Sequence, residues 1–143
     1  MTSPYKPNTL FWVIAVLALL WNFMGIFQFI GPIFFPEAIF EGYSQEAVDM
    51  FNGFPTWYTV VFGIATISGL LASIVFLMRK KIAVFLFLVS MITVFIVEGY
   101  YIFGTKVTEI LGQAAIYMPI IVIVCSIFLY FYSKGAARKG WLK

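Results

Sequence analysis

Four long apolar segments dominate this sequence and restrict the folds that are open to it. They cover residues 9–30, 57–78, 82–103 and 113–133. Glu98 is the one charged residue within them. A helix of about 20 apolar residues crosses a hydrocarbon layer of ~30 Å. The sequence therefore predicts an all-α membrane protein, a four-transmembrane-helix bundle in which residues 1–143 form a single transmembrane domain.

The composition excludes several other classes of protein. Hydrophobic residues make up 63% of the chain and charged residues 10%, whereas soluble domains average about 45–50% and about 25%. This balance excludes a soluble globular domain, a disordered chain and a nucleic-acid-binding module. The first apolar segment is longer than the core of a secretion signal, and no small-x-small cleavage site follows it. We therefore expect it to be retained as a span, with the lipid bilayer as the protein's first partner.

Lysine and arginine residues are distributed unevenly between the two sides of the predicted bundle. Eight of the nine basic residues fall on one side: Lys6, Arg79, Lys80, Lys81, Lys134, Arg138, Lys139 and Lys143. The other side carries Lys106 alone, with an outer loop over residues 31–56 that holds four acidic residues and no basic one. By the positive-inside rule, we predict that both termini are cytoplasmic in a multi-pass protein of the cell inner (plasma) membrane.

The outer loop contains the signals of a short helix. Ser44 can cap a helix over residues 45–51, which would carry Ala47 and Phe51 on one side. We predict a short amphipathic helix that lies at the membrane interface. A loop without regular structure is the alternative.

Local signals also predict where the first and last spans begin and end. Asn8 or Thr9 can cap the first helix, and Gly31-Pro32 is expected to end it because proline removes a backbone donor. Pro119 predicts either a kink in the fourth span or a span that begins nearer Tyr117.

Small residues recur at helical spacing in the first two spans. They are Ala18 and Gly25 in the first span, and Ala65, Gly69 and Ser73 in the second. Small side chains let two membrane helices approach closely. We interpret these faces as helix-packing surfaces. They fit packing within one four-helix bundle, and they also fit the seam of a homo-oligomer.

Glu98 in the third span is the residue that topology does not explain. An ionised carboxylate in hydrocarbon costs several kcal/mol, so an acid in a span is a functional-site hypothesis by default. Polar groups predicted at a similar depth, or able to reach it, are Asn22, Gln28, Tyr58, Tyr101, Tyr117 and Lys106. Among these, Asn22 is the best candidate for a buried hydrogen bond between helices.

Two interpretations of Glu98 remain open. In the functional one, its carboxylate binds a proton or a cation and anchors a pocket that faces outward, together with Asn22, Gln28, Tyr101 and Tyr117. In the structural one, it is a hydrogen-bonded carboxylate near the interface that holds the third span against the first.

No arrangement of residues typical of an enzyme is present. The chain has no histidine, one cysteine, no pair of carboxylates within a span and no glycine-rich phosphate loop. We expect no metal site and no cofactor. Chemistry on a membrane lipid or a quinone is a lesser alternative, because its motifs are loose.

Several short motifs resemble a known group of proteins. They are Trp21-Asn22-x-x-Gly25, Pro55-x-Trp57, Ala65-x-x-x-Gly69, Arg79-Lys80-Lys81-x-Ala83 and Ser90. Over nearly its whole length the chain resembles small bacterial four-span inner-membrane proteins, some of which carry the label sugar transporter. It is also similar in size to DoxX-like proteins, although it shares no distinctive motif with them. The resemblance implies a fold and a compartment.

These observations lead to two functional hypotheses. The first is a non-enzymatic inner-membrane protein that acts as an accessory or interaction subunit of a larger membrane complex. The alternative is a homo-oligomeric transporter of a small solute, sugar-like or proton-coupled, that uses Glu98. The sequence does not indicate the substrate.

Overall fold

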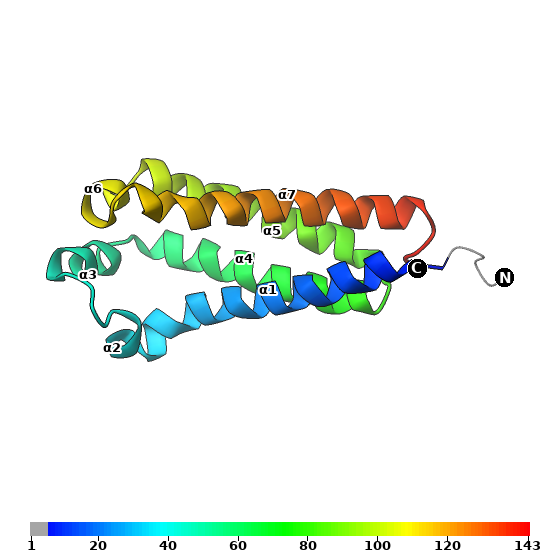
Figure 1. Cartoon of the computed structure of the whole chain (residues 1–143), viewed down its shortest axis with the longest axis horizontal. Helices are drawn as coiled ribbons and strands as arrows, with labels where there is room; N and C mark the ends of the chain where they lie inside the picture. Colours follow the sequence, from blue (N-terminus) through cyan, green and yellow to red (C-terminus); the bar gives the residue numbers. More distant parts are fainter. Residues whose placement is uncertain (1–5) are drawn as a thin grey trace.

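The protein is a bundle of long helices, with its short elements gathered at one end (Figure 1). This computed structural model describes residues 6–143. The long helices are α1 (Thr9–Phe34), α4 (Thr56–Leu77), α5 (Ile82–Phe103) and α7 (Tyr117–Arg138). The short ones are α2 (Pro36–Ile39), α3 (Gln45–Asn52), α6 (Val107–Leu111) and the 3-10 helix η1 (Gln113–Ile116). No strand occurs within residues 6–143.

The structure confirms the all-α fold and its four spans. Four helical stretches are long and apolar enough to cross a membrane: Thr9–Phe34, Thr56–Leu77, Ile82–Phe103 and Gln113–Arg138. Large apolar side chains project outward from them, including Leu17, which is 58% exposed, and Phe27, which is 66% exposed. Side chains of this kind suit contact with lipid. The chain is a multi-pass membrane protein.

The four spans pack in a row rather than in a closed ring. Helix α1 packs against α4, α4 against α5, and α5 against α7. Within the described chain, α1 and α7 have no comparable interface with each other. Figure 1 shows α4 between and behind these two outer helices.

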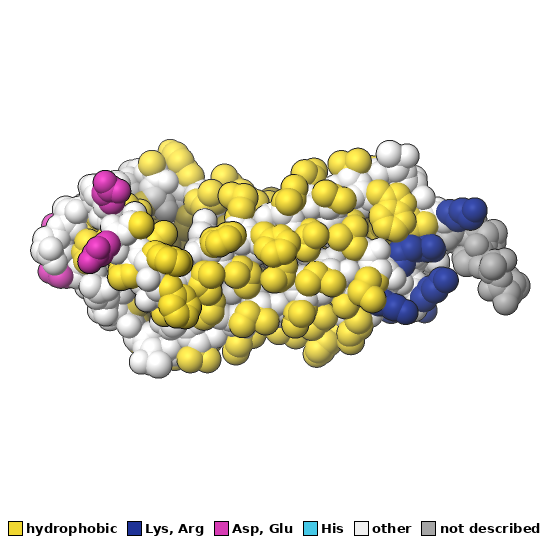
Figure 2. All heavy atoms as spheres, turned by 90° about the horizontal axis from the view of Figure 1, so that it is seen from below, with side chains coloured by type: hydrophobic (Ala, Val, Ile, Leu, Met, Phe, Trp, Pro, Cys, Tyr) yellow, Lys and Arg dark blue, Asp and Glu magenta, His cyan; other side chains and the backbone are white. Residues whose placement is uncertain are grey.

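Charged side chains separate to the two ends of the bundle, with an apolar surface between them (Figure 2). The basic end carries Lys6, the turn at residues 79–81 and the tail at residues 134–143. The acidic end carries α2, α3 and α6. This separation matches the uneven distribution of lysine and arginine along the sequence.

The ends of the first and fourth helices differ from the prediction. The expectation that the first helix ends near Gly31-Pro32 is wrong, because α1 continues to Phe34. Pro32 cannot donate to the carbonyl of Gln28, but the next turn is held by a 2.7 Å bond from the Phe35 N–H to the Gly31 carbonyl. The α-helix α7 begins at Tyr117, but the 3-10 helix η1 directly precedes it, so the apolar helical stretch starts at Gln113 as predicted and runs on to Arg138 rather than ending at residue 133.

The predicted caps are confirmed. The Asn8 side chain accepts a 2.9 Å hydrogen bond from the Phe11 N–H at the start of α1. Ser44 Oγ accepts one of 3.1 Å from the Ala47 N–H, and α3 follows as a regular helix. Ala47 is fully buried on the inner side of α3. The position of α3 at a membrane interface stays a prediction.

The helix-packing residues lie largely between α1 and α4. Ala18, Ala65, Gly69 and Ser73 are buried, and the Cα of Gly25 faces the Thr66 methyl group. A Cβ at Gly69 would collide with the side-chain oxygen of Asn22. These contacts show packing within one bundle, and a homo-oligomer seam stays a prediction.

The main hydrophobic core lies toward the basic end. Phe76 of α4 is fully buried and its ring centroid lies 4.8 Å from that of Phe11 in α1. It also lies 5.7 Å from the ring of Phe87 in α5 and 6.2 Å from that of Tyr132 in α7. One side chain thus connects all four spans.

The C-terminal residues close the basic end over the α4–α5 turn. The Lys143 N–H donates to the Arg79 carbonyl at 2.7 Å, and the Lys81 N–H donates to the Lys143 carbonyl at 3.2 Å. Arg79 Nε donates to the Trp141 carbonyl at 2.8 Å. Leu142 is buried beneath these bonds, at 2% exposure.

Replacing Tyr132 by phenylalanine is expected to stabilise the protein by about 1 kcal/mol. The Tyr132 hydroxyl is buried and has no hydrogen-bond partner among residues 6–143. Removing a buried, unpaired polar group removes its desolvation cost. The measurement is the thermal unfolding midpoint in detergent. Tyr130→Phe is the control, since its hydroxyl is not an unpaired buried group; an equal gain in both variants would contradict the explanation.

Candidate functional site

The Glu98 carboxylate is enclosed by the bundle and has no fixed partner. Its side chain is 8% exposed, on the inner face of α5. Among residues 6–143 it receives no hydrogen bond, whereas Thr93 on the same helix bonds to the carbonyls of Val89 and Ser90. Glu98 instead lines two adjoining cavities.

The inner cavity lies between the four spans and has a volume of about 80 Å³. Each span contributes a polar side chain to its wall: Asn22 from α1, Thr66 from α4, Ser90 from α5 and Ser126 from α7. A polar space of this size can hold a few water molecules.

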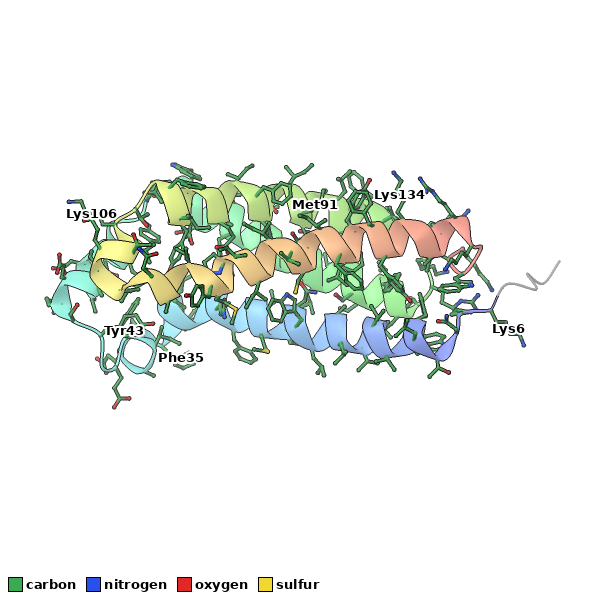
Figure 3. The ribbon with its side chains drawn as sticks, turned by 45° about the horizontal axis from the view of Figure 1, so that its top comes forward. Lys6, Phe35, Tyr43, Met91, Lys106 and Lys134 are labelled. Carbon is green, nitrogen blue, oxygen red and sulfur yellow. The ribbon has the colours of Figure 1, made fainter. Side chains whose placement is uncertain are left out.

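The outer cavity lies at the acidic end and has a volume of about 470 Å³. This falls in the range of small-molecule pockets, ~300–1,000 Å³. Its wall is rich in aromatic rings: Phe29, Phe40, Tyr43, Phe51, Phe54, Tyr58, Phe62 and Tyr101. Tyr43, labelled in Figure 3, comes from the connection between α2 and α3 and is 45% exposed, so this wall reaches the surface.

The two cavities meet at Glu98. Gln28, Phe62, Met118 and Val122 also line both of them. The carboxylate therefore lies where the wide aromatic outer cavity meets the smaller, mostly apolar inner cavity. Such a pocket, mostly apolar with a few convergent polar groups, is typical of a small-molecule site.

Two prolines lie in the wall of the outer cavity. Pro32 lies inside α1 and has no N–H, so it cannot bond to the carbonyl of Gln28 one turn earlier, and Gln28 also lines this cavity. Proline in a span is tolerated where other groups or water can reach the freed carbonyl. Pro119 is the third residue of α7, where N–H groups have no partner within the helix, so it frees no carbonyl. Pro32 therefore adds one backbone acceptor close to the chamber.

Asn22 has a structural part in this region. Its Nδ2 donates to the Ala18 carbonyl at 2.8 Å and to Ser73 Oγ at 2.9 Å, which joins α1 to α4. Ser90 Oγ donates to the Ala65 carbonyl at 2.9 Å and joins α5 to α4. This network holds the floor of the inner cavity in place.

The structure brings together four of the five residues that the sequence proposed as a polar site. Asn22, Gln28 and Glu98 line the inner cavity, and Gln28, Glu98 and Tyr101 line the outer one. Tyr117 is the exception: it is 62% exposed and lines neither cavity. Residues two apart face opposite sides of a helix, so Tyr117 faces outward where Pro119 is buried.

Lys106 does not pair with Glu98. It is exposed at the acidic end (Figure 3) and lines neither cavity. The carboxylate is therefore not a surface group neutralised by the nearby loop.

The aromatic wall is the part of the site that sequence reasoning missed. Of these rings, only Tyr58 and Tyr101 were predicted near the depth of Glu98, and Phe51 was expected on one side of the outer-loop helix. Tyr58 and Phe62 lie four residues apart on one side of α4. That spacing was the available signal.

Comparison with protein-family models, with curated proteins and with solved structures finds no match. Within residues 6–143, no cluster of three or more Cys, Asp or Glu side chains is arranged to hold a metal ion. The case for function therefore depends on the chemistry of the two cavities.

Proposed function

We propose that this protein binds a small solute within the membrane and transports it, with Glu98 as the group that binds the solute or a proton. The observation that carries this proposal is the carboxylate itself. It is 8% exposed, has no partner in residues 6–143, and lies at the junction of two cavities.

A carboxylate with a purely structural role is expected to be paired, because a buried charged group costs several kcal/mol unless hydrogen bonds or an opposite charge offset the loss of water. Glu98 forms no hydrogen bond within residues 6–143 and faces the two cavities, while Asn22, Ser73 and Ser90 in the same bundle are all hydrogen-bonded. A proton or a solute that enters the chamber would supply the missing partner.

The arrangement also supports access from one end at a time. The outer cavity lies at the acidic end, whereas the Phe76 cluster and the C-terminal residues fill the basic end. Alternating access requires these two ends to open in turn. We propose that a second copy completes the path, because α1 and α7 both line the inner cavity without packing on each other.

The orientation is part of the same proposal. The basic end is cytoplasmic and the acidic end lies outside the inner membrane, with α3 at the outer interface. The eight basic residues at one end support this orientation.

Replacing Glu98 by glutamine is expected to abolish solute-driven proton movement. Glutamine keeps the shape of the side chain but cannot exchange a proton. The measurement uses proteoliposomes that contain the pH dye pyranine. Gradients of sucrose, glycine, lactate and choline are applied in turn, and the wild type should change the internal pH with at least one of them.

The matched control is Glu109→Gln. Glu109 is an exposed acid of α6 at the same end and lines neither cavity, so its removal should leave the signal unchanged. Equal signals from wild type and Glu98→Gln would overturn the role of Glu98. No signal above empty liposomes with any of the four solutes would count against proton-coupled transport.

A second candidate function is an accessory subunit of a larger membrane complex, without enzymatic activity. The observation that favours it is that α1 and α7 share no extensive interface within residues 6–143, which leaves room for a helix of another protein to pack beside them. Purification in mild detergent tests it. Met24 is exposed on α1 and adjacent to the inner cavity. A partner protein that co-purifies in fixed stoichiometry with the wild type, but not with Met24→Trp, would support this role over transport.

A further inference from the structure

We propose that the solute taken by the Glu98 site is an organic cation, an alkylated or arylated onium ion rather than a sugar, an anion or a metal ion. This inference rests on the proposed function and names its substrate class. It is carried by three features of the two cavities within residues 6–143: one carboxylate without a hydrogen-bond partner, an aromatic wall, and no Lys or Arg in the lining.

The aromatic rings form a continuous wall along the outer cavity. The ring of Phe51 lies 5.4 Å from that of Phe54, which lies 4.8 Å from Tyr58, which lies 5.9 Å from Phe62. Tyr101 faces the same wall, 6.4 Å from Phe54. The faces of aromatic rings attract cations, and cages of such rings are a known means of recognising quaternary ammonium groups.

The charges of the site favour a cation over an anion. Glu98 is the only charged residue among those described that line either cavity, and no Lys or Arg of residues 6–143 contributes to their walls. The acidic end also carries Glu37, Glu41 and Glu46 on its surface. Lys106 is the one basic residue at this end, so the excess of negative charge raises the local concentration of cations.

The chemistry of the wall argues against the other solute classes. A hard metal cation needs about six or more oxygen ligands, but among residues 6–143 Glu98 supplies the one charged oxygen donor of the outer cavity. A sugar could use the amide and hydroxyl groups of Gln28, Asn52 and Tyr58 in this wall, but it would leave the charge of Glu98 unbalanced. An onium ion uses both the rings and the charge.

The experiment compares probes of similar shape and different charge. The probes are tetraphenylphosphonium, tetraphenylborate and neutral triphenylphosphine oxide, with sucrose as a sugar. Equilibrium binding is measured on the purified full-length chain in detergent, and empty micelles give the background for each probe. We expect saturable binding of tetraphenylphosphonium alone.

Variants assign that binding to the site. Glu98→Gln is expected to weaken tetraphenylphosphonium binding by about tenfold or more, and Phe54→Leu by about threefold or more, because each loses part of the cation's stabilisation. Tyr58→Phe should retain binding, since it keeps the ring. Phe27→Leu is the control, because Phe27 is 66% exposed and lines neither cavity. Circular dichroism and size-exclusion profiles confirm that each variant is folded.

The outcomes separate this inference from the proposed function. Glu98-dependent binding of sucrose or of the neutral probe would overturn the cation inference while leaving solute binding at Glu98 intact. Binding of tetraphenylborate as tight as that of tetraphenylphosphonium, or binding unchanged in Glu98→Gln, would also overturn it. If no probe binds and no solute drives proton movement in proteoliposomes, both proposals fail together.

Discussion

Replacing Phe76 by alanine is expected to lower the free energy of unfolding by about 3 kcal/mol. Truncating a buried aromatic residue costs ~3–5 kcal/mol in soluble cores, and the lower end applies where lipid replaces water around the separated helices. Phe76 is fully buried and its ring lies near Phe11, Phe87 and Tyr132, one from each of the other spans. The change therefore removes contacts with all three neighbouring helices.

The matched control for this change is Phe27→Ala. Phe27 has the same side chain in a long helix, but it is 66% exposed on the outer surface of α1. Its truncation should change stability by less than about 1 kcal/mol, since lipid fills the space that the ring leaves. Thermal or denaturant unfolding in detergent, followed by near-ultraviolet circular dichroism, measures both variants. Equal losses would show that Phe76 is not the centre of a packed core.

Replacing Gly69 by alanine is expected to destabilise the protein by about 1–3 kcal/mol, the usual cost of an overpacked site. A Cβ at this position would collide with the Asn22 side-chain oxygen and lie 3.1 Å from Ser90 Oγ. Asn22 cannot move away freely, because its Nδ2 donates to Ser73 Oγ at 2.9 Å. The added methyl group would push α1 away from α4 at the floor of the inner cavity.

Gly99→Ala provides the control for the glycine substitution. Gly99 also lies within a span, but a Cβ there meets no described atom within 4 Å. The change should be neutral or stabilise α5 by up to ~1 kcal/mol, because alanine favours the helix. Unfolding midpoints of the two variants are compared in the same detergent. A Gly69→Ala variant as stable as Gly99→Ala would contradict the close approach of α1 and α4.

Local sequence signals predicted helix positions well where the residues of one segment are enough to determine its helix. The spans at residues 57–78 and 82–103 agree within one residue with α4 and α5. Asn8 and Ser44 cap the helices that they were expected to cap. The end of α1 was misjudged, because a proline weakens a helix turn but does not forbid it. The helix continues past Pro32 because the Phe35 N–H still donates to the Gly31 carbonyl.

The site was predictable only in part. Depth along a span is a local property, so Glu98, Gln28 and Tyr101 were grouped correctly around the outer cavity, while Asn22 lies deeper, on the inner cavity that Glu98 also lines. The direction in which a side chain faces depends on the rotation of its helix against its neighbours. Tyr117 was therefore grouped with them at the right depth although it points outward.

By itself, the sequence determined that this chain crosses a membrane four times, which end is basic, and that one carboxylate lies within a span. These properties follow from hydrophobicity and charge along the chain, and they need no knowledge of which helices touch. Only the tertiary structure decided that Glu98 has no hydrogen-bond partner among residues 6–143, that α1 and α7 share no extensive interface there, and that rings from distant segments form one wall. Those features arise from contacts between residues far apart in sequence, and the hydropathy of a single segment does not determine which distant segments it contacts.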